Sequence, residues 1–164
     1  MTATARAARG WFALAVTLLV IDQATKFLAE NWLTYNRPIP VLPSLNLTLL
    51  YNRGAAFSFL AGQDGWQRWL FSALAIGVSL YLAALLRNPA PAPRAYRAGL
   101  ALILGGAIGN LVDRVRLGHV VDFIQVYHDN WFFPAFNVAD SGITVGAGLL
   151  ILCTLRGTWP DAAA

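Results

Sequence analysis

Four long runs of apolar residues, separated by polar segments, dominate the pattern of this chain. The first extends from Trp11 to about Ala29, and the second, Trp69–Leu86, contains no charged residue. The third and fourth runs, Ala98–Val112 and Ser141–Leu155, are each bounded by an aspartate. A transmembrane helix needs about 20 predominantly apolar residues. We therefore expect four transmembrane helices, over residues 11–29, 66–87, 96–113 and 138–156.

The segment between the first two runs carries a different pattern. In "LNLTL", residues 45–49, leucine alternates with polar residues, which is the period-two pattern of a half-buried strand. Three prolines ahead of it keep the chain extended. Asn52-Arg53-Gly54 predicts a turn, from which residues 55–60 can return as a second strand. We expect a small β-sheet over about residues 37–62, resting on the membrane surface.

The other two connectors differ in composition. Residues 88–95 are short, rich in proline and basic, which is typical of a simple connector. Residues 114–136 contain "HVVDFIQVY", which favours a strand or a surface-lying segment, and "WFFPAF", whose aromatic side chains prefer the headgroup layer. In the last two runs, Gly105-xxx-Gly109 and Gly142-xxx-Gly146 predict close helix contacts. We expect one membrane domain over residues 1–164.

Composition supports a membrane protein over a soluble helical bundle. Of 164 residues, 57% are hydrophobic and 12% are charged, and a soluble domain of this length has too little interior to bury that much apolar surface. Four spans place both termini on one side, where the segments hold six basic residues and one acidic residue, whereas the other side holds six basic and seven acidic residues. These basic residues lie in short segments beside the span ends, so the positive-inside rule predicts cytoplasmic termini. The net charge of +4 needs no nucleic-acid partner, because loops that face anionic lipid usually carry such an excess.

Three aspartates lie close together in the sequence, each against apolar residues: Asp113, Asp122 and Asp140. An ionised carboxylate near lipid is costly unless it has a use. If the third and fourth spans are neighbours, Asp113 and Asp140 lie at similar depth, and the short step to Asp122 lets it meet either. Two adjacent carboxylates share a proton, so that one is an acid and the other a base. Such a pair can activate water and protonate a leaving amine, which predicts hydrolysis of a peptide bond.

Each acid also has a structural explanation. Asp113 precedes Arg114, and such neighbours at a helix end usually form an ion pair, which makes Asp113 structural or substrate-orienting. Asp140 begins an apolar helix, where an N-cap role is common. Asp22 and Lys26 are four residues apart and predict an ion pair on one helix face. The residues alone therefore predict an acid pair without choosing its members.

Five short motifs occur in order along the chain: "DQATK" at 22–26, "YNRGAAFSFL" at 51–60, "GNLVDR" at 109–114, "VVDF" at 120–123 and "FNVADS" at 136–141. Each is weak alone, but together they closely resemble the lipoprotein signal peptidases, the type II signal peptidases of bacteria. The resemblance covers the chain from about Trp11 to Leu155. It implies a membrane α-helical fold, with four transmembrane helices, a small periplasmic β-sheet called the cradle, and a lid within the loop 114–136.

The resemblance also implies a function. The expected activity is that of an aspartic endopeptidase of the bacterial inner membrane, acting near the periplasmic face without a metal or cofactor. The substrate would be a prolipoprotein whose cysteine carries diacylglycerol, cut just before that cysteine. We expect a monomer surrounded by membrane lipids, with no nucleic-acid partner.

Residue roles follow from the same motifs. The resemblance implies that Asp122 and Asp140 form the catalytic pair. The residues expected to bind or orient the substrate and to hold the geometry of the pair are Asn52, Asn110, Asp113, Arg114 and Asn137. Asp22 and Lys26 are expected to support the fold and the site from the first span.

Three rival classes are disfavoured by the sequence. An ion-coupled transporter or channel usually holds its ionisable groups near the membrane midplane, often within repeated halves. Here the acids stand at the ends of apolar runs, and no repeat is visible. A presenilin-like aspartic protease would carry a "GxGD" signature, which "GNLVD" does not supply. A non-catalytic membrane chaperone is disfavoured only by the motif match.

Overall fold

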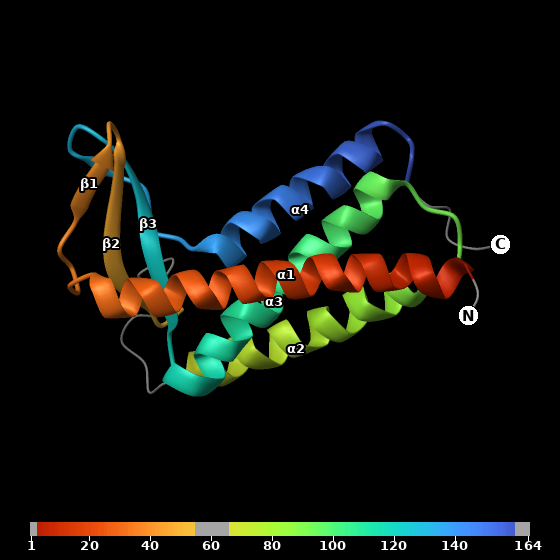
Figure 1. The fold of residues 1–164 in the computed structure, drawn as a ribbon, viewed down its shortest axis with the longest axis horizontal. Coiled ribbons are helices and arrows are strands. Elements are labelled where there is room, and N and C mark those ends of the chain that lie inside the picture. The colour runs from red at the N-terminus through yellow and green to blue at the C-terminus, as the bar shows by residue number, and fades with distance from the viewer. Residues whose placement is uncertain (1–2, 55–65, 160–164) are drawn as a thin grey trace.

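A bundle of four long helices carries a small β-sheet at one end (Figure 1). The computed structural model describes residues 3–54 and 66–159. Its helices are α1 (Ala3–Trp32), α2 (Trp66–Arg87), α3 (Arg94–Leu117) and α4 (Val138–Leu155). Within the described residues, all four are long and apolar enough to cross a membrane, α1 through its part Ala8–Trp32. The expected membrane α-helical fold with four spans is confirmed.

Helix α3 lies at the centre of the bundle and packs against each of the other three helices. Glycines allow this packing, as the GxxxG spacing predicted. A Cβ atom added at Gly105 would lie 2.5 Å from the backbone oxygen of Ala15 in α1. One added at Gly146 in α4 would lie 2.7 Å from the backbone oxygen of Gly99 in α3. Larger residues at these positions would force the helices apart.

The sheet joins two parts of the chain that are far apart in the sequence. Its strands are β1 (Ile39–Leu42), β2 (Leu45–Asn52), β3 (Val120–His128) and β4 (Trp131–Phe132), antiparallel in the order β1-β2-β3-β4. The expected strand over residues 55–60 lies outside the described residues. The described neighbours of β2 are β1 and β3. Because β3 and β4 both lie within the loop 114–136, where we expected a lid, much of that loop belongs to the sheet.

Strand β2 buries polar side chains as well as apolar ones. Asn46 and Thr48 are buried, whereas Leu45 and Leu47 are only half-buried. The register of β2 against β3 shifts between Leu47 and Leu50, which interrupts strict alternation. A sheet beside a polar site can bury its polar face, so periodicity alone did not identify the inner side.

Two apolar clusters lie on either side of the polar centre of the molecule. One joins the helices and includes Leu86 and Leu100. The other joins the end of α1 to the sheet through Ala29, Leu49 and Val121. The first residues of α1 and the last of α4 lie at the end of the bundle opposite the sheet (Figure 1), and we call these ends the terminal end and the sheet end. The polar centre lies toward the sheet end.

Candidate active site

Asp122 lies in the middle of β3 and is 2% exposed. Its Oδ1 accepts a hydrogen bond of 2.7 Å from Nδ2 of Asn137, and Asn52 also donates to this carboxylate. Asn52 ends β2, and its Oδ1 accepts from the backbone N–H of Gly54, whose φ of +97° suits a glycine turn. The predicted turn therefore directs the Asn52 amide toward Asp122.

Asp140 lies in the first turn of α4. Asn137 is the N-cap residue, and its Oδ1 accepts from the backbone N–H of Asp140 at 2.9 Å. In return Oδ2 of Asp140 accepts from the backbone N–H of Asn137 at 3.3 Å, which completes a capping box. The alternative prediction that Asp140 is the N-cap residue is thus wrong, because the N-cap is Asn137, three residues earlier. Asp140 still helps to cap the helix.

Two asparagine side chains connect these carboxylates. Nδ2 of Asn110 donates to Oδ1 of Asp140 at 2.7 Å, and Nδ2 of Asn137 donates both to Asp122 and, at 3.2 Å, to Oδ1 of Asn110. Each amide has one orientation that fits. The oxygen of Asn110 faces the ammonium of Lys26, and the oxygen of Asn137 faces a backbone N–H, so both NH₂ groups must point to the acids.

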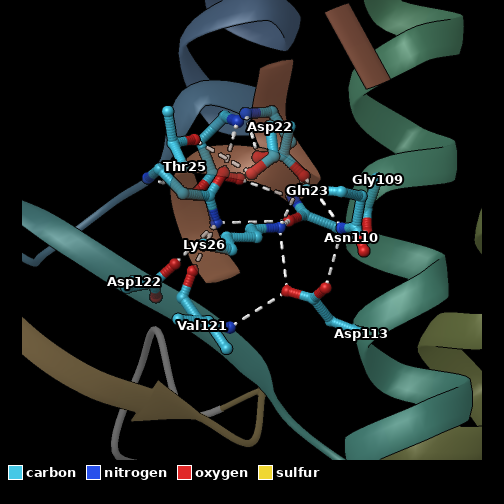
Figure 2. A network of polar contacts seen from close by, with 12 residues as sticks. Asp22, Gln23, Thr25, Lys26, Gly109, Asn110, Asp113, Val121 and Asp122 are labelled. Atoms are coloured by element: carbon cyan, nitrogen blue, oxygen red, sulfur yellow. Dashed lines mark hydrogen bonds and ion pairs between the residues drawn. The ribbon is translucent and has the colours of Figure 1, made fainter. Parts of the chain in front are cut away.

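Lys26 stands at the centre of a buried polar network (Figure 2). Its Nζ lies 2.9 Å from Oδ2 of Asp22, 2.8 Å from Oδ2 of Asp113 and 2.9 Å from Oδ1 of Asn110. The predicted ion pair between Asp22 and Lys26 is confirmed. A buried ammonium is costly unless it is paired and hydrogen-bonded, and here each of its contacts is an oxygen.

Asp22 and Asp113 also accept hydrogen bonds from backbone N–H groups of other elements. Oδ1 of Asp22 accepts from the backbone N–H of Ala139 at the start of α4, at 2.8 Å. Oδ2 of Asp113 accepts from the backbone N–H of Val121 in β3, at 3.1 Å. The ion pairs with Lys26 therefore fix the positions of the two segments that carry Asp140 and Asp122.

The expected ion pair between Asp113 and Arg114 is wrong, because Asp113 pairs with Lys26. Consecutive helical residues point in different directions, so they do not face each other. The guanidinium of Arg114 lies 5.5 Å from the ring centre of Phe71 in α2, and it donates weakly, at 3.4 Å, to the backbone oxygen of Asn110. Its positive charge still acts electrostatically on Asp140 and Asp122.

The pKa of Asp122 is raised from its ordinary value of 3.8 to about 7, mainly by burial and also by the negative charge of Asp140. The hydrogen bonds from Asn52 and Asn137 and the charge of Lys26 act in the opposite direction and limit the rise in this pKa. A carboxyl group with a pKa near neutrality can either hold or release a proton at physiological pH. Asp122 therefore has the property that an acid–base catalyst needs.

Gln23 is a member of the network that the sequence reasoning missed. Its Nε2 lies within hydrogen-bond distance of Asp113 at 2.9 Å and of both Asp22 and the backbone oxygen of Gly109 at 3.2 Å. Its position inside "DQATK" is the signal that could have identified it. Across residues 3–54 and 66–159, no three His, Cys, Asp or Glu side chains gather in a way that could hold a metal ion.

Comparisons with known proteins agree on one family. A family model described as signal peptidase (SPase) II matches residues 14–156. A lipoprotein signal peptidase of Acinetobacter baylyi is 53% identical over 145 residues, which cover 88% of this chain and 80% of that protein. One from Pseudomonas fluorescens is 54% identical over 144 residues, covering 87% of this chain and 85% of that protein.

Solved structures support the same assignment. A structure described as a bacterial membrane enzyme matches 91% of this chain and 94% of its own, with a TM-score of 0.79 and 32% sequence identity. A second structure with the same description has the same TM-score and identity and is covered over 89% of its length. The family match extends over nearly all of the chain and includes every residue of the polar network. The chain belongs to the signal peptidase II family.

Proposed function

We propose that the chain removes signal peptides from prolipoproteins with Asp122 and Asp140 as its catalytic pair. The observation that carries this proposal is the bridge between the two carboxylates. The amides of Asn137 and Asn110 join them in a chain of hydrogen bonds of 2.7, 3.2 and 2.7 Å. Groups on β3 and α4 are thereby held toward a common centre, as shared acid–base chemistry requires.

The two carboxylates have different environments, which divides their roles. Asp122 is enclosed in the sheet, and its raised pKa suits the protonated form near neutrality. Asp140 is half-buried in the first turn of α4, where the helix dipole favours a negative charge. The pair then holds one proton on Asp122 and one negative charge on Asp140, the division that aspartic proteases use.

This division accounts for each step of hydrolysis. Asp140 accepts a proton from water while the water oxygen bonds to the scissile carbonyl carbon, and Asp122 donates its proton to the carbonyl oxygen. When the tetrahedral intermediate collapses, the carbon–nitrogen bond breaks and the leaving nitrogen takes a proton from Asp140. The hydroxyl proton of the intermediate returns to Asp122, which restores the starting state. No metal or organic cofactor takes part.

The proposed recognition of the substrate follows from the physical chemistry of a peptide in lipid. A signal peptide reaches the site as an apolar helix, and its scissile bond must be unwound, which leaves backbone groups without partners. Polar side chains at the site, including Asn52 and Asn110, can satisfy these groups. Diacylglycerol on the substrate cysteine adds roughly 0.8 kcal/mol for each buried methylene. We therefore propose that the lipidated cysteine follows the cleaved bond directly.

The chain is a multi-pass protein of the bacterial inner membrane, and we propose its orientation from charge. The segments on the terminal side hold six basic residues and one acidic residue, whereas those on the other side hold six basic and seven acidic residues, which favours a cytoplasmic location for both termini. The sheet end, with Asp122 and Asp140, would then lie near the periplasmic face. We further propose that residues 1–164 form one membrane unit that works as a monomer, with lipids around it and without nucleic acid.

The pair can be tested with purified protein and a prolipoprotein whose cysteine carries diacylglycerol. Asp122→Asn and Asp140→Asn should each abolish the conversion to the shorter form on a gel. Asp129→Asn is the matched control, because the Asp129 side chain is 88% exposed. This variant should cleave the substrate normally. Normal turnover by either of the first two variants would refute the pair. Equal rates on lipidated and unlipidated substrate would refute only the lipid requirement.

A further inference from the structure

The terminal end of the bundle carries positive charge that no described carboxylate balances. Within residues 3–54 and 66–159, every aspartate and glutamate lies toward the sheet end, on the later part of α1, the end of α3, β3 and its turn, or the first turn of α4. None of the ion pairs in this part of the chain includes an arginine. The arginines at the terminal end with described side chains are Arg9, Arg87, Arg94, Arg97 and Arg156.

A cavity of about 290 Å³ lies at this end, beside two of these arginines. Residues 88–92 of the α2–α3 connector line it, together with Trp11, Arg94 and Arg97. Arg94 is exposed, and its side chain makes no hydrogen bond or ion pair with the residues that the structure describes. Its guanidinium is thus free to bind an anion at the cavity.

Arg97 gives the cavity a fixed shape. Its guanidinium donates to the backbone oxygens of Leu86 at 3.4 Å, Asn88 at 3.0 Å and Ala90 at 2.7 Å. The side chain of Asn88 also accepts from the backbone N–H of Ala90 at 2.9 Å. These bonds hold the connector in one conformation while the charge of Arg97 stays without a counter-ion. A preorganised site loses less entropy when a ligand binds.

The position of the cavity indicates which anion it meets. Helix α2 ends its span at Arg87 and α3 begins its span at Arg94, so the connector lies at the membrane boundary. Trp11 lines the cavity, and indole rings prefer the headgroup layer. Phosphate is the principal anionic group at that depth, and arginine binds it through paired N–H groups.

An apolar groove begins one helical turn deeper. It has a volume of about 310 Å³ and lies between α1, α2 and α3, with a wall that includes Phe12, Leu80 and Ala83. Phe12 follows Trp11 in the chain, and Ala83 lies one turn before Arg87. A basic cavity at headgroup depth next to an apolar groove along the helices matches the shape of a phospholipid.

We propose that this cavity binds the headgroup of an anionic phospholipid, with an acyl chain in the adjacent groove. Arg94 supplies the main contact to the phosphate and Arg97 shapes the cavity. The site lies at the end of the bundle opposite Asp122 and Asp140, so it does not depend on the proposed catalytic pair. Basic pockets between transmembrane helices are known as lipid headgroup sites.

The test measures lipid binding to the purified full-length protein by native mass spectrometry. Phosphatidylglycerol and phosphatidylcholine with identical acyl chains are titrated separately, and the wild-type protein should bind phosphatidylglycerol several-fold more tightly. Arg94→Gln should reduce that affinity about fivefold, the effect expected for one basic residue at an anionic membrane surface. Arg9→Gln is the matched control, because Arg9 is exposed at the same end but does not line the cavity.

Three results would overturn the proposal. Equal affinity of the wild-type protein for the two lipids would remove the headgroup contact. An equal loss in the Arg9 and Arg94 variants would show a general effect of surface charge. Displacement of phosphatidylglycerol by inorganic phosphate at similar concentration would show an ion site instead of a lipid site. Unchanged melting temperature and peptidase activity in Arg94→Gln would confirm that the variant is folded.

Discussion

The ammonium nitrogen of Lys26 lies 2.9 Å from Oδ1 of Asn110. This contact sets the orientation of the Asn110 amide, whose nitrogen donates to Asp140 at 2.7 Å. The buried ammonium of Lys26 on α1 thus determines the direction in which the Asn110 amide on α3 donates. That amide in turn holds the carboxylate of Asp140 on α4. The hydrogen bond that Asp140 receives from Asn110 therefore depends on Lys26.

Lys26→Met should destabilise the protein strongly. The variant leaves Asp22 and Asp113 buried without their positive partner, and breaking a buried ion pair typically costs about 3–5 kcal/mol. Thermal unfolding in detergent measures the change. Arg37→Met is the control, because Arg37 is exposed and its side chain has no ion pair in the described part of the chain. Equal melting temperatures for the two variants would show that the network contributes little.

Asp113→Asn should act through stability and site geometry. The new side chain can still accept from Val121, but it loses its charge interaction with Lys26. We expect a loss of about 1–3 kcal/mol in the free energy of unfolding, with measurable cleavage remaining at low temperature. A well-folded variant with full activity at all temperatures would show that Asp113 is dispensable.

Asn110→Leu should lower kcat far more than it changes substrate affinity. Leucine keeps a similar size but cannot donate to Asp140 or accept from Lys26. We expect a decrease in kcat of roughly 100-fold, the lower end of what a positioned acid–base group contributes. Asn31→Leu, at an exposed site on α1, should leave kcat unchanged. An increase in KM with unchanged kcat would contradict the role of Asn110 in positioning Asp140 and would leave only its contact with the substrate backbone.

Asp122→Asn should stabilise the protein at high pH. The pKa of Asp122 is about 7 in the folded protein and near its ordinary value of 3.8 in the unfolded chain. Between these values the folded state keeps a proton that the unfolded state has lost, so the free energy of unfolding falls as the pH rises through that window. Asparagine cannot ionise, so the variant should lack this decline.

Melting temperatures of both proteins from about pH 4 to about pH 9 test this sign. The variant should gain stability relative to the wild type as the pH rises from about 4 to about 7 and keep a constant advantage above that range, while Asp129→Asn should follow the wild-type curve. A variant that gains nothing relative to the wild type across this range would contradict the raised pKa of Asp122.

Gly109→Ala should disturb the site from the helix interface. Its Cβ atom would lie 2.6 Å from Oδ2 of Asp22, the oxygen that pairs with Lys26. We expect both stability and activity to fall. The free energy of unfolding should decrease by about 1–3 kcal/mol, as at other overpacked sites. Gly77→Ala is the control, because open space surrounds Gly77 and alanine favours a helix there. A neutral Gly109→Ala would show that Asp22 can move freely.

The local pattern of the sequence was enough to identify the spans, the strand β2 and the pair Asp22–Lys26. Apolar runs report membrane helices because lipid excludes polar side chains along a whole helix. The ion pair follows from a spacing of four residues on one helix. The choice of Asp122 and Asp140 as the proposed catalytic pair came from motif resemblance, since spacing alone left Asp113 equally eligible.

Only the tertiary structure decided which partners meet across the bundle. Asp113 pairs with Lys26 on another helix, β2 pairs with β3 across a wide sequence gap, and Asn137 rather than Asp140 caps α4. These contacts depend on how helices pack, where strands align and at which residue a helix begins. Each is a long-range or boundary property, and neighbouring residues in the sequence carry little information about it.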